Sequence, residues 1–165
     1  MKKHELSERD ICTKFITPAL QRAGWQHHQF REEVKLTDGR VIVRGKLAAR
    51  IKSSEVKGGP KRADYVLYAQ PSTPIAVVEA KHASFQVGHG MQQALVYAEM
   101  LDVPFAISSN GKGFLLHDRT GLTQPIEREL NLDEFPSIDD LWPLYQQWKG
   151  ITTTDALKLI EQPFH

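Results

Sequence analysis

Two carboxylates and an ammonium group could form one small polar site in this chain, contributed by Asp64, Glu79 and Lys81. Carboxylates are hard oxygen ligands of the kind that Mg²⁺ prefers, together with backbone carbonyls and water. A lysine beside them could orient or deprotonate a water molecule, or neutralise charge that develops on a phosphate. With the carbonyl of Ala80 as a further ligand, these residues offer the components of a Mg²⁺-dependent hydrolytic site.

The Glu-x-Lys pattern has little value by itself, because average composition predicts roughly one acid-x-Lys match in a chain of this length. This chain contains three matches, Glu33-Val34-Lys35, Glu55-Val56-Lys57 and Glu79-Ala80-Lys81. Only the third ends an apolar run, Ile75 to Val78, and only it follows a strand that opens with an acid. The alternative interpretation is a surface Lys–Glu pair on an edge strand, and an acid matched across the hairpin weighs against it.

Two β-rich segments must position these residues, Ala63 to Ala69 and Ile75 to Ala80, with a turn-forming stretch between them. If the segments pair antiparallel, Asp64 and Glu79 lie at the same end of the sheet. Residues two apart on a strand share a face, so Glu79 and Lys81 should point the same way. We expect the carboxyls of Asp64 and Glu79 to lie about 4–6 Å apart, as shared ligation of one cation requires.

The remaining elements follow from apolar periodicity and from capping residues. Ser7 can cap a helix that Gly24 ends and Pro18 kinks. A second helix should span Gly90 to Asp102, and closing helices should span Ser137 to Trp148 and Thr154 to Glu161. Further strands are expected at Phe30 to Leu36 and Val41 to Val43, around Asp38-Gly39, and at Phe105 to Ser108 and Phe114 to His117, around Asn110-Gly111. The expected order is αββββαββαα, an α/β fold.

The sequence resembles the PD-(D/E)XK nucleases. Asp64 followed by Glu79-x-Lys81 at the end of an apolar strand is similar to their signature, with Ala63 in place of the proline. Gln93 and Tyr97, which share one face of a helix, resemble the QxxxY motif of the RecB-like branch. An amphipathic helix that merely covers the sheet is the alternative for this pair. The resemblance implies a restriction-endonuclease-like core, a central mixed β-sheet flanked by helices.

Longer stretches resemble the N-terminal nuclease region of type I restriction enzyme R subunits, namely SERDICTKFITPALQRAGW, GKGFLLHD and FPSIDDLWPLY. The resemblance implies that an acid of the first helix completes the metal site. Glu8 matches that position, while Glu5 and Asp10 remain open, and an acid that favours the helix dipole is the alternative for all three. The resemblance also implies Mg²⁺ as cofactor and catalytic roles for Asp64, Glu79, Lys81, Gln93 and Tyr97, with Asp64, Glu79 and Glu8 as metal ligands.

Type I R subunits act on double-stranded DNA with methyltransferase and specificity subunits, and the specificity subunit reads the DNA sequence. Residues 1–150 are therefore expected to form the nuclease domain, and residues 151–165 to begin a linker or helix toward a helicase-like motor. ATP would serve only that motor, because the chain contains no GxxxxGK[ST] pattern. A free-standing resolvase or repair nuclease and a catalytically silent DNA-binding or docking module are the two alternatives.

Charge is distributed unevenly along the chain. Its formal net charge is only +1, but eight basic residues face the single acid Glu55 between Arg40 and Arg62. Between Asp118 and Asp140, seven acids face two basic residues. We expect the basic segment to form a mobile loop that contacts DNA phosphates, through Arg44, Lys46, Arg50, Lys52, Lys57, Lys61 and Arg62. A solvated loop followed by a solvated acidic segment is the alternative.

Composition sets the broad class of the protein. The chain has 165 residues, of which 41% are hydrophobic and 25% charged, as expected for one globular domain. Its one cysteine excludes an internal disulfide, and its aliphatic runs are too short to span a bilayer. Glu5, Glu8 and Asp10 stand where a signal peptide would need apolar residues. We therefore expect a cytoplasmic protein without a membrane partner.

Overall fold

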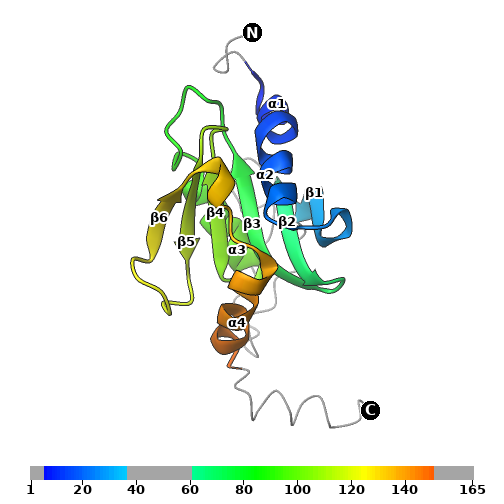
Figure 1. Cartoon of the computed structure of the whole chain (residues 1–165), viewed down its shortest axis with the longest axis vertical. Coiled ribbons are helices and arrows are strands. Elements are labelled where there is room, and N and C mark those ends of the chain that lie inside the picture. Colours follow the sequence, from blue (N-terminus) through cyan, green and yellow to red (C-terminus); the bar gives the residue numbers. More distant parts are fainter. Residues whose placement is uncertain (1–5, 37–60, 151–165) are drawn as a thin grey trace.

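A six-stranded mixed sheet forms the centre of the computed structural model, which describes residues 6–36 and 61–150 (Figure 1). The strands lie in the sheet in chain order, and only β3 and β4 run parallel. Their bounds are Phe30–Leu36 (β1), Lys61–Gln70 (β2), Thr73–Ala80 (β3), Phe105–Ser109 (β4), Phe114–Asp118 (β5) and Glu127–Leu130 (β6). The expected α/β fold with a central mixed sheet is confirmed.

The β2–β3 hairpin forms as the sequence predicts, with both strands slightly longer than expected. Tyr65 pairs with Val78 and Val66 with Val77. In this register Asp64 and Glu79, the next residues toward the end of the hairpin, lie opposite each other. β3 lies between β2 and β4, and its residues from Ile75 to Ala80 are all buried. A strand covered on both faces favours a continuous apolar run rather than an alternating pattern.

Helix α3 (Met91–Leu101) forms the crossover between the parallel strands β3 and β4. Gly90 is its N-cap, and Asp102 ends it in the left-handed conformation with φ 56°. The bounds agree with the helix expected between Gly90 and Asp102. Because parallel neighbours need a long connection, this helix is the element that allows β4 to continue beside β3.

The N-terminal helical region is divided into α1 (Glu8–Ile11), the π-helical turn η2 (Cys12–Ile16) and α2 (Thr17–Arg22). Ser7 caps α1 through a capping box with Asp10. The expected interruption near Pro18 occurs as the π-helical turn directly before it, since proline cannot donate a backbone hydrogen bond. Gly24, with φ 101°, ends the region as predicted.

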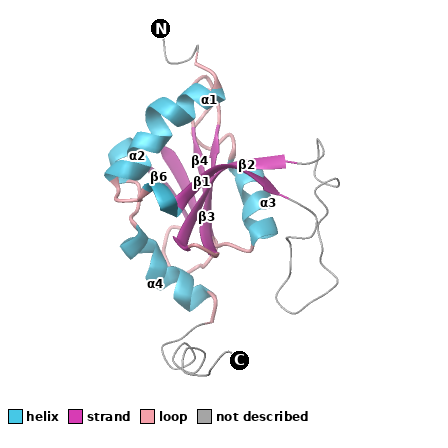
Figure 2. Ribbon diagram, turned by 90° about the vertical axis from the view of Figure 1, so that its right-hand side faces the viewer, coloured by secondary structure: helices cyan, strands magenta, loops and turns pink. Residues whose placement is uncertain are grey.

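Helices cover both faces of the sheet (Figure 2). α1, α2 and α4 (Ile138–Trp148) lie on one side and α3 lies on the other. Two core clusters correspond to these layers. The first contains Ile11, Leu20, Tyr65, Val78 and Phe105, and the second contains Val66, Val77, Ala94, Tyr97 and Met100. Neighbouring residues Val77 and Val78 therefore pack into opposite layers, as a strand requires.

Several elements differ from the prediction or lie beyond the described residues. Strand β6, which pairs antiparallel with β5, was not predicted. Short 3-10 turns, η3 (His27–Gln29) and η6 (Leu132–Glu134), were also not predicted. The expected strand Val41 to Val43 and the expected helix Thr154 to Glu161 lie outside the described residues. Among the described strands, β1 pairs with β2.

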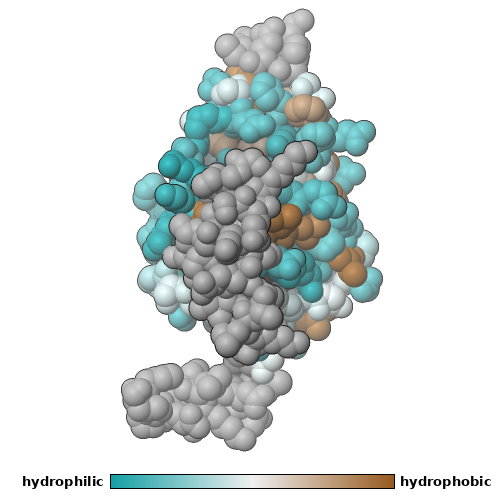
Figure 3. All heavy atoms as spheres, turned by 180° about the vertical axis from the view of Figure 1, so that it is seen from behind, coloured by the Kyte–Doolittle hydropathy of each residue, from teal (hydrophilic) through white to brown (hydrophobic). Residues whose placement is uncertain are grey.

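The surface seen in Figure 3 carries hydrophobic residues scattered among hydrophilic ones. Within residues 6–36 and 61–150, no helix combines the length and the apolar character that crossing a bilayer demands. The large hydrophobic side chains exposed on the described part of the protein are Phe85, Val96, Leu122 and Ile126.

Candidate active site

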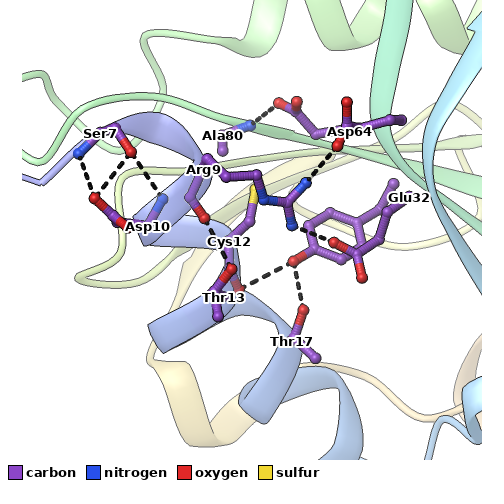
Figure 4. Close-up of polar contacts among 11 residues, drawn as sticks. Ser7, Arg9, Asp10, Cys12, Thr13, Thr17, Glu32, Asp64 and Ala80 are labelled. Atoms are coloured by element: carbon purple, nitrogen blue, oxygen red, sulfur yellow. Dashed lines mark hydrogen bonds and ion pairs between the residues drawn. The ribbon is translucent and has the colours of Figure 1, made fainter.

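The carboxylates of Asp64 and Glu79 each accept a hydrogen bond from a backbone amide of the opposite strand at the end of the β2–β3 hairpin. The Asp64 amide donates to Glu79 Oε2 at 2.8 Å, and the Ala80 amide donates to Asp64 Oδ2 at 2.8 Å. The second bond is drawn in Figure 4. After burial, the charge of Asp64 is the next cause that raises the pKa of Glu79, so the two acids are electrostatic neighbours, and the expected separation of 4–6 Å stays a prediction. We call Asp64 and Glu79 the acid pair.

Burial dominates the electrostatics of the acid pair. Glu79 is only 3% exposed, and this desolvation, followed by the negative charge of Asp64, raises its pKa well above the ordinary value. Desolvation also raises the pKa of Asp64, against the opposing effect of the bond from Ala80. Lys81 lowers the pKa of both acids, but more weakly than burial raises it. Lys81 therefore offsets only part of the free-energy cost of ionising the two acids.

Helix α1 brings a third carboxylate toward the acid pair. The charge of Glu8 raises the pKa of both Asp64 and Glu79. Asp10 instead accepts bonds from the Ser7 amide, at 3.2 Å, and from the Ser7 hydroxyl, at 2.9 Å (Figure 4). Glu5 lies outside the described residues. The geometry therefore favours Glu8 over Asp10 as the acid that the first helix supplies.

Arg9 holds α1 against strand β1. Its guanidinium pairs with Glu32 and, at 3.0 Å, with Glu33, and it also lowers the pKa of Asp64 (Figure 4). Glu33 has φ 52°, an unusual conformation for a residue with a side chain. Glu33 and Lys35, the first of the three acid-x-Lys matches, are both exposed on β1.

Lys81 directly follows β3 and packs against the N-cap of α3. Its amide donates to the Ser109 carbonyl at 2.8 Å, which continues the parallel pairing with β4. A Cβ atom on Gly90 would lie 3.1 Å from Lys81 Cγ and 3.1 Å from Ser108 Oγ. Gly90 therefore makes room for the lysine side chain. Its role was missed in the sequence, although it directly precedes the helix that carries Gln93 and Tyr97.

Gln93 and Tyr97 are joined on α3, where Gln93 Nε2 donates to Tyr97 Oη at 2.6 Å. Burial, and then the charge of Glu79, raises the pKa of Tyr97 to about 12. The influence of Glu79 places the tyrosine near the acid pair. Strands β2 and β3 and helices α1 and α3 thus bring Asp64, Glu79, Lys81, Gln93, Tyr97 and Glu8 to one region.

The donor set fits a divalent cation. The buried carboxylate of Glu79 and the half-buried one of Asp64, both with raised pKa values, would be stabilised in their ionised form by such an ion. In the described part of the chain, no three His, Cys, Asp or Glu side chains converge as ligands of one ion. A cation at the acid pair would therefore complete its shell with backbone oxygen and water, as Mg²⁺ commonly does.

Most of the expected basic loop lies outside the described residues, namely Arg44, Lys46, Arg50, Lys52 and Lys57. The prediction that the loop extends to Arg62 was wrong. Lys61 and Arg62 belong to β2, where they pair with Leu36 and Lys35 of β1. Backbone pairing with β1 extends β2 beyond its apolar run, so composition alone placed the boundary too late in the chain.

Comparisons with known proteins agree with the geometry. The family model of the type I restriction enzyme R protein N terminus matches residues 13–136. The type I restriction enzyme EcoAI endonuclease subunit from Escherichia coli is 46% identical over 162 residues, which cover 97% of this chain and 19% of that protein. A solved fragment described as an HsdR subunit of a type I restriction enzyme from Vibrio vulnificus YJ016 is also similar, with 39% identity and a TM-score of 0.71. That match covers 97% of this chain and 29% of the fragment.

Proposed function

The chain belongs to the family of type I restriction enzyme R protein N termini, and on this premise we propose that it is a Mg²⁺-dependent endonuclease domain that hydrolyses DNA phosphodiester bonds. The observation that carries the proposal is the acid pair beside Lys81, in which Glu79 is buried, Asp64 is half-buried and both pKa values are raised. A protein does not ordinarily withdraw two adjacent carboxylates from water unless a cation or a proton compensates them.

Each residue of the site has a distinct task in this proposal. Asp64 and Glu79 hold the cation, and Glu8 adds negative charge near them. The bound Mg²⁺ supplies a Lewis acid for the phosphate oxygens. Lys81 orients or deprotonates the attacking water, or neutralises charge that develops on the phosphate. Gln93 and Tyr97 position the phosphate, since their hydrogen bond fixes the tyrosine hydroxyl near Glu79.

The chain spans about a fifth of its Escherichia coli relative, which is 46% identical. We propose that the cutting activity serves a longer R subunit, in which an ATP-driven motor brings double-stranded DNA to this domain. Methyltransferase and specificity subunits are the proposed protein partners. The basic residues from Arg44 to Arg62 are proposed to contact DNA phosphates without reading the bases.

A plasmid-nicking assay tests the proposal. Supercoiled plasmid is incubated with the wild-type chain and with Glu79→Gln in Mg²⁺, Mn²⁺ or Ca²⁺. We expect the substitution to reduce nicking by about 100-fold or more, because it removes an ionised ligand. DNA binding should stay the same or become tighter, since one negative charge that repels phosphates is lost. Glu99→Gln, at an exposed position of α3, is the matched control.

Two outcomes would contradict the proposal in different ways. If Glu79→Gln nicks plasmid as fast as Glu99→Gln, the chemistry does not occur at the acid pair. If the wild-type chain binds DNA but cuts none in any of the three metals, alone or within the complete R subunit, the domain is a silent DNA-binding module.

A further inference from the structure

An exposed pair of stacked rings lies in the segment that connects Lys81 to α3. The rings of Phe85 and His89 lie 4.1 Å apart between centroids, and their planes differ by only 9°. Phe85 is 43% exposed, and His89 is also exposed. Neither ring is needed to fill the core, so the pair forms an apolar surface that faces solvent.

Hydrogen bonds hold this segment, residues 82–90, in a defined shape. Asn110 Nδ2 donates to the Phe85 carbonyl at 2.8 Å, and Ser108 Oγ donates to the Val87 carbonyl at 2.7 Å. The Gly90 amide donates to Ser108 Oγ at 3.1 Å. In Figure 1 the segment is the green loop beyond the end of the sheet, beside the turn between β4 and β5. These hydrogen bonds therefore fix the backbone of the segment that carries the two rings.

The stacked rings are adjacent to the candidate active site. His89 directly precedes Gly90, whose backbone packs against the Lys81 side chain. Phe85 is only four residues beyond Lys81, and its amide donates to the His82 carbonyl at 3.0 Å. A polymer that places one phosphate at Lys81 would therefore pass close to the two rings.

Charge and shape indicate the kind of partner. The segment 82–90 contains no acidic residue. A cavity of about 630 Å³ is lined by Gln86, which follows Phe85, and by Asn110, Lys112 and Glu129, among others. Exposed flat rings, with Lys81 just before their segment and Lys112 in this cavity, suit a ligand that combines a flat ring with phosphate charge.

We propose that Phe85 and His89 form a stacking surface for an unpaired nucleobase of a DNA strand that occupies the candidate active site. Inside a duplex, base faces are covered by their neighbours, so only an end, a gap or a locally opened strand offers a free face. Aromatic side chains bind such bases by stacking on the free face, whatever the sequence, because every base has a π-face. This inference rests on the proposed function, because it needs a DNA strand at Lys81.

The test compares Phe85→Ala and Phe85→Trp with Leu122→Ala and Leu122→Trp in the same chain. Leu122 is a suitable control because it is 47% exposed but lies between β5 and β6. Binding of a gapped DNA and of a closed hairpin duplex is measured by fluorescence anisotropy, with Ca²⁺ in place of Mg²⁺. Phe85→Ala should weaken binding of the gapped DNA about tenfold, which corresponds to about 1.4 kcal/mol, and change duplex binding much less.

Phe85→Trp keeps a flat ring and should retain wild-type affinity. Its added fluorescence, measured as a difference from the wild-type chain with its three tryptophans, should be quenched by gapped DNA. Leu122→Trp should not respond. This second readout does not depend on the folding of the alanine variant.

The possible failures are distinguishable. If wild-type nicking persists while Phe85→Ala binds gapped DNA as Leu122→Ala does, the stacking surface is wrong and the proposed nuclease stands. An equal loss of gapped and duplex binding, or unquenched fluorescence from Phe85→Trp at saturation, also overturns the stacking surface. If the wild-type chain binds neither DNA and cuts none, both proposals fail.

Discussion

Gly90 is the residue whose lack of a side chain most directly affects the proposed chemistry. Its φ of −88° suits any residue, so the reason for glycine is space and not backbone strain. A Cβ atom would press on Lys81 Cγ and Ser108 Oγ, each 3.1 Å away. Because Ser108 is buried and bonded to the Val87 carbonyl, the lysine is the neighbour that would move.

We therefore expect Gly90→Ala to slow plasmid nicking by roughly 10- to 100-fold, since a misplacement of about 1 Å can cost that much. DNA affinity should change little. Gly88→Ala is the matched control, because its added Cβ would meet only the far end of the Leu115 side chain. Equal nicking rates for the two variants would show that Lys81 does not depend on Gly90.

The sequence favours Glu79-x-Lys81 among the three acid-x-Lys matches, and the match at Glu55 and Lys57 lies outside the described residues. The buried run before Glu79 and the acid opposite it were visible as composition and spacing, whereas Glu33 and Lys35 proved to be exposed on β1. The bonds from the Asp64 and Ala80 amides to the two carboxylates were not predictable in the same way. They depend on the register of β2 and β3 to within one residue, which turn residues alone do not fix.

At the scale of elements, the π-helical turn is tied to the strand that carries Asp64. The Tyr65 hydroxyl donates to the Cys12 carbonyl at 3.0 Å and lies 2.6 Å from Thr17 Oγ1. Tyr65 is fully buried, and desolvation raises its pKa. The residue after Asp64 is therefore bonded to the helical region that follows α1.

Removal of this hydroxyl should loosen α1. We expect Tyr65→Phe to lower the free energy of unfolding by about 1–2 kcal/mol, because the partner carbonyl in the core loses a donor. It should also weaken Mn²⁺ binding, measured by calorimetry, since Asp64, the preceding residue on β2, is then held less firmly. Tyr68→Phe is the control on the same strand, because Tyr68 packs in the other core cluster. Lower stability with unchanged Mn²⁺ affinity would show that metal binding does not depend on the contact between Tyr65 and the N-terminal helical region.

Elements with strong periodicity or capping residues were predicted well, whereas β6 was missed. Its four residues, Glu127–Leu130, are exposed or half-buried and carry three charges. It forms because the Gly113 backbone lets the Leu130 carbonyl approach, to 2.8 Å from where a Cβ of residue 113 would stand. Such a strand is specified by its partner β5 and not by its own pattern.

The stability of the whole molecule should depend on pH through the acid pair. Carboxyls whose pKa is higher in the folded state bind more protons there, so the free energy of unfolding falls as pH rises. Their contribution is fully present below the unfolded pKa values, about 3.9 for Asp and 4.3 for Glu. It is lost as pH rises through the raised folded values of Asp64 and Glu79.

Denaturant titrations without metal should therefore show that the free energy of unfolding falls as pH rises from the unfolded to the folded pKa values of the two acids. Glu79→Gln should make this fall smaller. Because Mg²⁺ binds ionised carboxylates, its stabilising effect should grow with pH over the same range. Glu99→Gln should keep the wild-type profile. A Mg²⁺ effect that is equal at both ends of the window, or an unchanged slope in Glu79→Gln, would contradict this electrostatic account.

The two backbone amides that bond to the acid pair also report whether each carboxyl is protonated or bound to a metal. The Asp64 amide donates to Glu79, and the Ala80 amide donates to Asp64. Protonation or coordination of a carboxyl alters its strength as an acceptor, and thus the chemical shift and exchange rate of the amide proton that it holds. The protein therefore carries two native indicators, one for each acid, and both can be followed before any substrate is present.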